Sequence, residues 1–304
     1  MQPARLIFLY FATVFLGGAL LAPWLHALAQ MAGQNVPALQ GLAEAPFHRY
    51  MTRCWMIAGV LGLWPLARAL GLDSREKLGL RGAGNGQPGV LAGFALGFVT
   101  LALAAGLTVR FGPRAWNLDH SAEVWAEYLF KAVLAASVVS IVEEIFFRGV
   151  LFGALRQSMR WPGALLSSSM VYAFLHFFDR AAHTGPVTWS SGLALLPRML
   201  RGFGDAEALV PGFFNLMLAG CLLGLAYQRT GDLRFAIGLH AGWIFWLKSF
   251  GLLTSAGDGG SASWLWGTGK LIDGWMCLPL LLAAVPLVDR LGRGAKDKIQ
   301  ASGG

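Results

Sequence analysis

From Val90 to Val109 the chain reads VLAGFALGFVTLALAAGLTV, twenty residues without a charged side chain. An α-helix of this length spans about 30 Å, the thickness of the hydrocarbon core of a membrane. Because lipid offers the backbone no hydrogen-bond partner, a spanning segment must be a helix or a strand of a closed barrel. Barrel strands alternate apolar and polar residues, and this segment does not. It therefore predicts a transmembrane helix.

Comparable apolar segments recur along the whole chain of 304 residues. The sequence is 56% hydrophobic and only 13% charged, whereas about a quarter of the residues in a soluble domain are charged. We expect an all-α fold, a polytopic transmembrane helical bundle of about eight transmembrane helices. Their expected ranges are residues 5–28, 54–72, 90–109, 125–155, 163–178, 213–227, 235–250 and 271–288.

These segments suggest three regions. Residues 1–110 would hold N-terminal transmembrane helices, residues 124–250 a core that carries polar residues within the membrane, and residues 251–304 a C-terminal transmembrane helix with a basic tail. The longest connection is residues 181–212, and within it Leu193–Leu200 predicts a short helix at the membrane surface. That helix would be either an amphipathic connector or a gate for the entry of a substrate helix.

Lysine and arginine at the helix ends predict the orientation. An even number of helices places both termini on one side, and the side richer in Lys and Arg faces the cytoplasm. With the termini cytoplasmic, that side collects 13 such residues and the other side ten. The 13 are Arg5, Arg68, Arg75, Lys77, Arg81, Arg156, Arg160, Arg229, Arg234, Arg290, Arg293, Lys296 and Lys298, and the ten are Arg49, Arg53, Arg110, Arg114, Lys131, Arg180, Arg198, Arg201, Lys248 and Lys270. Both termini are therefore expected in the cytoplasm. Richness in Gly and Ala is typical of a bacterial chain, so the expected membrane is a bacterial inner membrane.

Two other classes of function do not fit. The net charge of +8 could indicate nucleic-acid binding, but the basic residues are not gathered on one element with interleaved aromatics, so no nucleic-acid partner is expected. Cys54, Cys221 and Cys277 lie far apart in apolar segments, without the spacing of a metal site or a disulfide framework. We interpret them as packing residues. The lipid bilayer is the expected surrounding.

Three charged residues interrupt the segment 125–155. Within SIVEEIFFRGVLF, which runs from Ser140 to Phe152, stand Glu143, Glu144 and Arg148. Each would cost about 2.5–3.5 kcal/mol at the centre of a transmembrane helix. Glu144 and Arg148 share one helix face in the order that favours an ion pair. Glu143 then remains without an obvious partner and is a candidate general base; alternatively, all three charges form a structural clamp between helices.

Two histidines interrupt other apolar segments, His176 in 163–178 and His240 in 235–250. One such histidine would more often be a packing residue. Two of them, together with a pair of carboxylates, are the residue types that deprotonate a water and stabilise an oxyanion. Gly238 and Gly242 flank His240 and would allow another helix to approach closely.

Motifs that the sequence lacks bear on the nucleophile and on the cofactor. The sequence has no Gly-x-Ser-x-Gly elbow and no evident Ser-Lys pair, so water is the expected nucleophile. It also has no His-Glu-x-x-His spacing, and a zinc ion would need Glu143, His176 and His240 to converge from three helices. The cofactor requirement therefore stays open: zinc, or none if Glu143 and His176 activate water directly.

Taken together, these motifs resemble the CPBP (Abi) family of intramembrane proteases, which includes the type 2 CAAX prenyl endopeptidase, or Ras-converting enzyme. The resemblance covers about residues 124–250 and makes this region a protease core. The matching motifs are Glu143-Glu144-x-x-x-Arg148, an aromatic residue with His176 four positions later, and His240 in a third helix.

The resemblance implies an intramembrane endopeptidase that cleaves a membrane-associated peptide or protein. Glu143 and His176 would activate water. Glu144 and Arg148 would hold the site together, and His240 would stabilise the oxyanion.

The sequence departs from the family pattern at two positions. Tyr172 replaces the usual Phe of the second motif and adds a hydroxyl, and Ile244 replaces the usual Asn of the third. Loss of one oxyanion donor can cost about 2.7–4 kcal/mol of transition-state stabilisation. Trp243 and Asn215 are candidate substitutes. The alternatives are a catalytically silent membrane protein of the binding or immunity type and a proton-coupled transporter.

Depth along the helices gives a mixed expectation. At 1.5 Å per residue, Glu143 lies about 20 Å from Arg156, and His176 lies about 20 Å from Pro162. His240 lies only about 9 Å beyond Arg234. The turn that precedes His240 must therefore be recessed, or His240 has another role.

Overall fold

The structure is a computed structural model that describes residues 3–80, 88–178, 181–257, 262–267 and 269–302, of which 294–302 are described as backbone alone. Four of the basic residues that predict the orientation are affected: Arg81 and Arg180 lie outside the described residues, as do the side chains of Lys296 and Lys298. Nearly all described secondary structure is helical. The strands β1 (Arg114–Trp116) and β2 (Thr254–Ala256) form one short antiparallel pair, so the all-α prediction is confirmed.

A helix is present at each of the eight expected places. Short helices connect them, and one of these, α9 (Ser191–Met199), lies where residues 193–200 predict it. The eight are α1–η1–α2 (Pro3–Ala12, Thr13–Gly17, Gly18–Asn35), α4 (Phe47–Ala69), α5 (Val90–Phe111), α6–η3–α7 (Ala122–Glu144, Ile145–Phe152, Gly153–Leu155), α8 (Trp161–Leu175), α10 (Ala206–Thr230), α11 (Leu233–Leu253) and α13 (Cys277–Ser302); the other short ones are η2 (Pro37–Leu39), α3 (Gln40–Ala43), η4 (Leu200–Phe203) and α12 (Ser263–Trp266).

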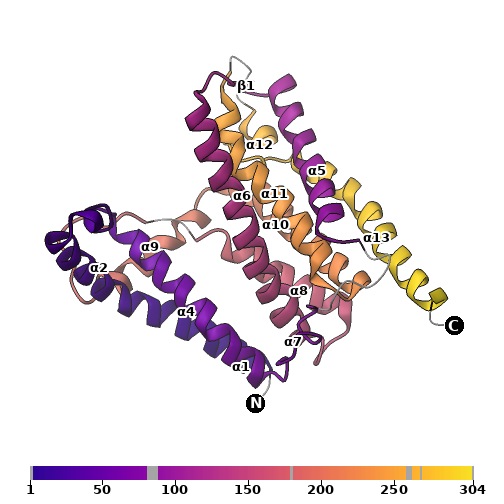
Figure 1. The fold of residues 1–304 in the computed structure, drawn as a ribbon, viewed down its shortest axis with the longest axis horizontal. Coiled ribbons are helices and arrows are strands. Elements are labelled where there is room, and N and C mark those ends of the chain that lie inside the picture. The colour runs from indigo at the N-terminus through magenta and orange to yellow at the C-terminus, as the bar shows by residue number, and fades with distance from the viewer. Residues whose placement is uncertain (1–2, 81–87, 179–180, 258–261, 268, 303–304) are drawn as a thin grey trace. The chain divides into compact units, whose positions relative to one another are not determined.

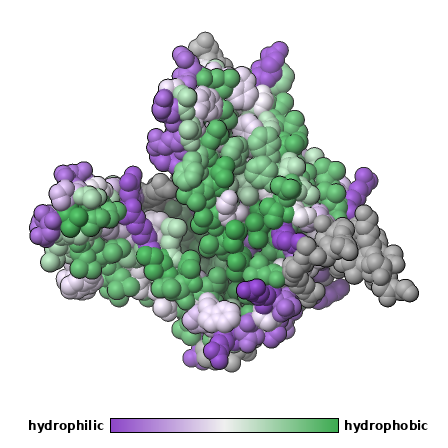
Figure 2. Space-filling model, viewed as in Figure 1, coloured by the Kyte–Doolittle hydropathy of each residue, from purple (hydrophilic) through white to green (hydrophobic). Residues whose placement is uncertain are grey.

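Four helices in the described part of the chain are long and apolar enough to cross a membrane. They are Pro3–Asn35, α5, α10 and α11. Large apolar side chains are widely exposed, among them Leu61, Leu91 and Phe130 at 68–84%. In the view of Figure 2, hydrophobic residues cover much of the helices, and hydrophilic residues gather mainly near helix ends. The protein is a polytopic integral membrane protein, while the count of eight membrane-spanning helices stays a prediction.

The described residues form two compact units (Figure 1). The first comprises Met1–Asp73 and Phe177–Asp205. In it α2 packs against α4 and α9. A Cβ atom on Gly192 would lie 1.9 Å from the Ala19 carbonyl oxygen, so glycine is needed where α9 meets α2.

The second unit comprises Ser74–His176 and Ala206–Gly304. Here α11 packs against α5 and α6, and α10 packs against α8, α11 and α13 (Figure 1). A Cβ atom on Gly238 would lie 2.0 Å from the Val90 carbonyl oxygen, and one on Gly242 would lie 2.5 Å from the Phe98 nitrogen. The predicted close approach is confirmed, and the approaching helix is α5. His240 is two residues from each glycine, so its side chain leaves the opposite side of α11.

Local sequence signals mark the N-termini of the helices that carry the polar residues. Ser121 caps α6 through its hydroxyl oxygen, which accepts from the Val124 N–H. Asp232 caps α11 by accepting from the Arg234 N–H at 2.8 Å. Pro162 stands in the first turn of α8, where its missing N–H costs nothing.

The turn between α10 and α11 is covered by protein. Gly231 makes the turn at φ 68°, and Asp232 is only 3% exposed. The Leu233 N–H donates to the Gly79 carbonyl oxygen at 2.8 Å. The segment around Gly79 therefore lies over this turn, while the depth of the turn in the membrane stays a prediction.

Candidate active site

An ion pair anchors the polar cluster at the point where α6 becomes the π-helical η3. Arg148 Nη1 donates to Glu144 Oε1 at 2.7 Å, and the two side chains are 3% and 0% exposed. Arg148 Nη2 donates to the Gly220 carbonyl oxygen on α10 at 3.1 Å. The predicted pairing of Glu144 with Arg148 is confirmed. Short π-helical segments are frequent at functional sites.

Aromatic rings enclose the same guanidinium. Arg148 Cζ lies 4.9 Å from the centroid of the Tyr172 ring and 5.6 Å from that of Phe147. The face of an aromatic ring attracts a cation, more strongly where water is excluded. A carboxylate, a carbonyl and two rings thus offset the cost of burying Arg148.

His240 reaches this cluster from α11. Its Nδ1 lies 2.9 Å from Glu144 Oε1, the same oxygen that accepts from Arg148. An ionised carboxylate can only accept, so Nδ1 carries a proton. The other ring nitrogen, Nε2, lies 3.8 Å from Glu143 Oε2. Glu144 therefore fixes the orientation of the imidazole and turns Nε2 toward Glu143.

Glu143 differs from its neighbour in exposure and in bonding. Its side chain is 28% exposed, against 0% for Glu144. Oε2 of each glutamate is buried without a hydrogen-bond partner among the described residues, but Oε1 of Glu144 binds Arg148 and His240. If both glutamates are ionised, Arg148 balances only one of them.

His176 ends α8 and joins the cluster through Tyr172. Its Nδ1 lies 2.7 Å from the Tyr172 carbonyl oxygen, and the two ring centroids are 4.4 Å apart. Because a carbonyl only accepts, Nδ1 carries the proton and a neutral ring keeps Nε2 as an acceptor. The Tyr172 hydroxyl lies 3.4 Å from His240 Nε2. Among the described residues no hydrogen bond or ion pair joins His176 to Glu143.

Beside His240 lies a cavity of about 30 Å³, large enough for a water molecule. Tyr172, Asn215 and Trp243 also line it. Both N–H groups of the Asn215 amide are used, at 2.9 Å by the Ile272 carbonyl and at 2.8 Å by the Gly274 carbonyl. The Trp243 indole N–H is buried without a partner in the described part of the chain. Of the two candidate substitutes for the missing Asn, Trp243 is the one whose donor has no partner among the described residues.

Ile244 makes apolar contacts instead. It belongs to a buried cluster with Ala136 of α6 and Ala241 of α11, against which Phe94 and Phe245 pack. The side chain at this position therefore contributes to the contact between α6 and α11.

The described residues contain no group of three or more His, Cys, Asp or Glu side chains that could hold a metal ion. Glu143 and His240 approach each other, but His176 does not complete a set of three.

The sequence of this site can be compared with known families. Residues 125–246 match the family model described as type II CAAX prenyl endopeptidase Rce1-like. The chain carries an Rce1-like domain. The resemblance drawn from the motifs is thereby confirmed, and all five candidate site residues lie inside the Rce1-like segment. Comparisons with curated proteins and with solved structures gave no match.

Within the Rce1-like domain, the tertiary structure adds contacts that the motifs did not indicate. The motifs distinguish Tyr172 only by its extra hydroxyl, yet Tyr172 contacts both histidines and the Arg148 guanidinium. The Gly220 carbonyl on α10 also binds Arg148. The sequence signal was present for Tyr172, a hydroxyl at a usually apolar position, but absent for a backbone carbonyl.

Proposed function

We propose that the protein is an intramembrane endopeptidase of the CAAX-protease type, which hydrolyses a peptide bond of a membrane-associated peptide or protein. The observation that carries the proposal is the facing pair of Glu143 Oε2 and His240 Nε2, 3.8 Å apart. This Glu143 oxygen is buried and has no hydrogen-bond partner among the described residues. The Glu144–Arg148 pair holds the imidazole in place. The Rce1-like family supports the reaction class.

In the proposed reaction Glu143 is the general base. It takes a proton from water, and the water oxygen attacks the carbonyl carbon of the scissile bond to give a tetrahedral intermediate. The proton then passes from Glu143 to the leaving nitrogen as the C–N bond breaks, so the products are a carboxylic acid and an amine. His176 Nε2, held as an acceptor by the bond from Nδ1 to the Tyr172 carbonyl, would orient the water.

His240 and Trp243 would stabilise the negative oxygen of the intermediate. A protonated His240 keeps its Nδ1–H on Glu144 and can donate Nε2–H to the oxyanion. The unpaired Trp243 N–H is the candidate second donor, because Ile244 has none to offer. Glu144 and Arg148 act through His240 and are positioning residues.

The membrane setting is part of the proposal. Eight helices would cross the inner membrane of a bacterium, with both termini in the cytoplasm and the protease core in residues 124–250. The substrate would reach the site from the bilayer.

The experiment compares the purified wild-type protein with Glu143→Gln for cleavage of a library of membrane-anchored reporter peptides. Glu127→Gln is the matched control, because Glu127 is an exposed carboxylate of the same helix, paired with Lys131. We expect Glu143→Gln to abolish cleavage in a protein of unchanged helical content, Glu127→Gln to keep it, and a chelator to leave it unaffected. Loss of cleavage on chelation, restored by zinc, would show that a metal ion activates the water instead.

A second candidate function is favoured by the apolar packing of Ile244. A family member without that oxyanion donor could serve as a catalytically silent binding or immunity-type protein. If the wild type cleaves no peptide in the library, and Glu143→Gln binds membrane-associated partners as the wild type does, the silent protein is the better description.

A further inference from the structure

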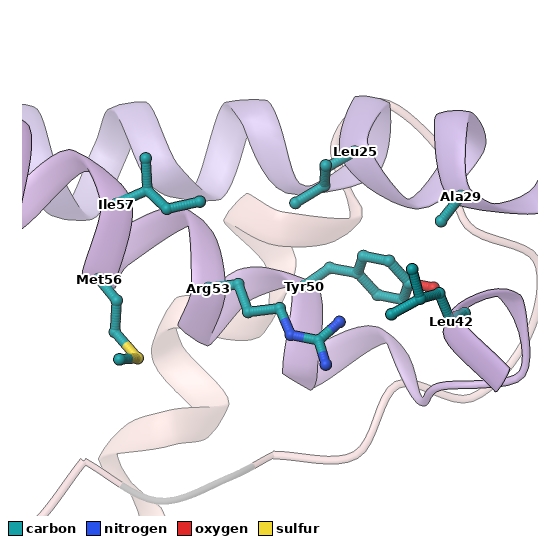
Figure 3. A pocket seen from close by; sticks show the side chains of 7 residues that line it. All are labelled: Leu25, Ala29, Leu42, Tyr50, Arg53, Met56 and Ile57. Carbon is teal, nitrogen blue, oxygen red and sulfur yellow. The ribbon is translucent and has the colours of Figure 1, made fainter. Parts of the chain in front are cut away.

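The first unit contains an open apolar groove of about 350 Å³, within the size range of small-molecule binding sites. Figure 3 shows the seven side chains that line it, contributed by α2, α3 and α4. Six are apolar or aromatic, and one, Arg53, is charged. The lining residues are Leu25, Ala29, Leu42, Tyr50, Arg53, Met56 and Ile57.

The positive charge of Arg53 has no carboxylate to balance it among the described residues. Arg53 is exposed, and its Cζ lies 6.0 Å from the centroid of the Tyr50 ring, beside which it lies in Figure 3. The exposed Arg49 stands four residues earlier and hence on the same face of α4. The N-terminus of α4, where Pro46 provides no side-chain cap, adds partial positive charge.

Arg53 lies near one end of α4, and the apolar part of the groove extends away from it. Arg53 is six residues, or about 9 Å, beyond the start of the helix. Met56 and Ile57 continue the groove farther along the helix, away from the charge. A guanidinium binds phosphate well, since it offers several donors with a full positive charge.

We propose that this groove binds one anionic phospholipid of the surrounding bilayer, with its phosphate on Arg53 and an acyl chain along Leu25, Met56 and Ile57. An apolar channel with an uncompensated cation at its edge complements an acyl chain joined to a negatively charged headgroup. A neutral apolar ligand would leave Arg53 unused. The proposal does not depend on the peptidase function, because every residue it uses belongs to the first unit.

The test measures lipid retained by the full-length protein after purification from mixed micelles, by native mass spectrometry. Phosphatidylglycerol and phosphatidylcholine with identical acyl chains are offered in equal amounts. We expect the wild type to retain one phosphatidylglycerol in preference. Arg53→Gln should lower that preference about fivefold, the factor expected for one basic residue near an anionic surface.

Two further variants separate the charge from the groove. Arg68→Gln removes an exposed arginine from the last turn of α4, outside the groove, and should behave as the wild type. Ala29→Phe fills the groove and should reduce the retention of both lipids. Circular dichroism checks that each variant keeps its helical content.

Three results would overturn the proposal. The wild type could retain both lipids equally, or Arg53→Gln could retain phosphatidylglycerol as the wild type does. The third such result is displacement of phosphatidylglycerol by a lipid-modified peptide at equal concentration. The groove would then be a site for a lipidated protein tail. None of these results bears on cleavage by the other unit.

Discussion

Each unit of the protein places an arginine beside a tyrosine ring, and the two pairs have opposite surroundings. Arg148 is 3% exposed and lies 4.9 Å from the Tyr172 ring, with a carboxylate and a carbonyl as further partners. Arg53 is exposed and lies 6.0 Å from the Tyr50 ring, without an ion pair in the described chain. The protein itself neutralises the buried cation and leaves the exposed one available. The buried pair is thus expected to serve internal structure, and the exposed pair a ligand.

The largest expected effect is on the free energy of unfolding when either of the two arginines is replaced by leucine. Arg148→Leu leaves the Glu144 charge buried and unpaired, and breaking a buried pair costs about 3–5 kcal/mol. Arg53→Leu changes an exposed site and should alter the unfolding free energy by under about 0.5 kcal/mol. Unfolding of both variants by SDS in lipid-free mixed micelles measures the difference. Equal stability losses would contradict the distinction.

The next largest effect concerns Trp243, a buried donor that lacks the hydrogen-bond partners of Arg148. The Trp243 N–H is buried without a partner among the described residues, and the proposed reaction uses it as an oxyanion donor. Trp243→Phe removes this donor and, if it serves the oxyanion, should lower kcat about 10²–10³-fold. Kinetics on a cleaved reporter peptide measure the loss, and KM should change little. A kcat within twofold of the wild type would return Trp243 to the role of a packing residue.

The smallest effect concerns the tyrosine of the buried pair. The Tyr172 hydroxyl lies 3.4 Å from His240 Nε2, a long hydrogen bond, and its ring continues to cover Arg148 when the hydroxyl is removed. Tyr172→Phe should therefore cost no more than about 1 kcal/mol, or about fivefold in kcat/KM. Steady-state cleavage rates check this value. A loss as large as that of Glu143→Gln would instead make the hydroxyl part of the proton path.

The local parts of the site follow from the sequence. Glu144 and Arg148 pair because residues four apart share a helix face, a relation that holds whatever the helix packs against. The close approach at Gly238 and Gly242 was likewise foreseeable, since only glycine leaves room for another backbone. Their partner helix, α5, could not be named, because nothing in a glycine specifies which helix fills the space.

The sequence by itself determined that this is a helical membrane protein, because long apolar segments have few alternatives in lipid, and it determined the residue types of the candidate site. Only the tertiary structure decided which of the two carboxylates holds His240. Residues 144 and 240 are 96 positions apart, and their contact depends on how α11 rotates and how its preceding turn is buried. The same packing decided that Ile244 faces α6 while Trp243 lines the cavity. Neighbours in a helix diverge by about 100°, so their surroundings depend on helices that sequence spacing does not identify.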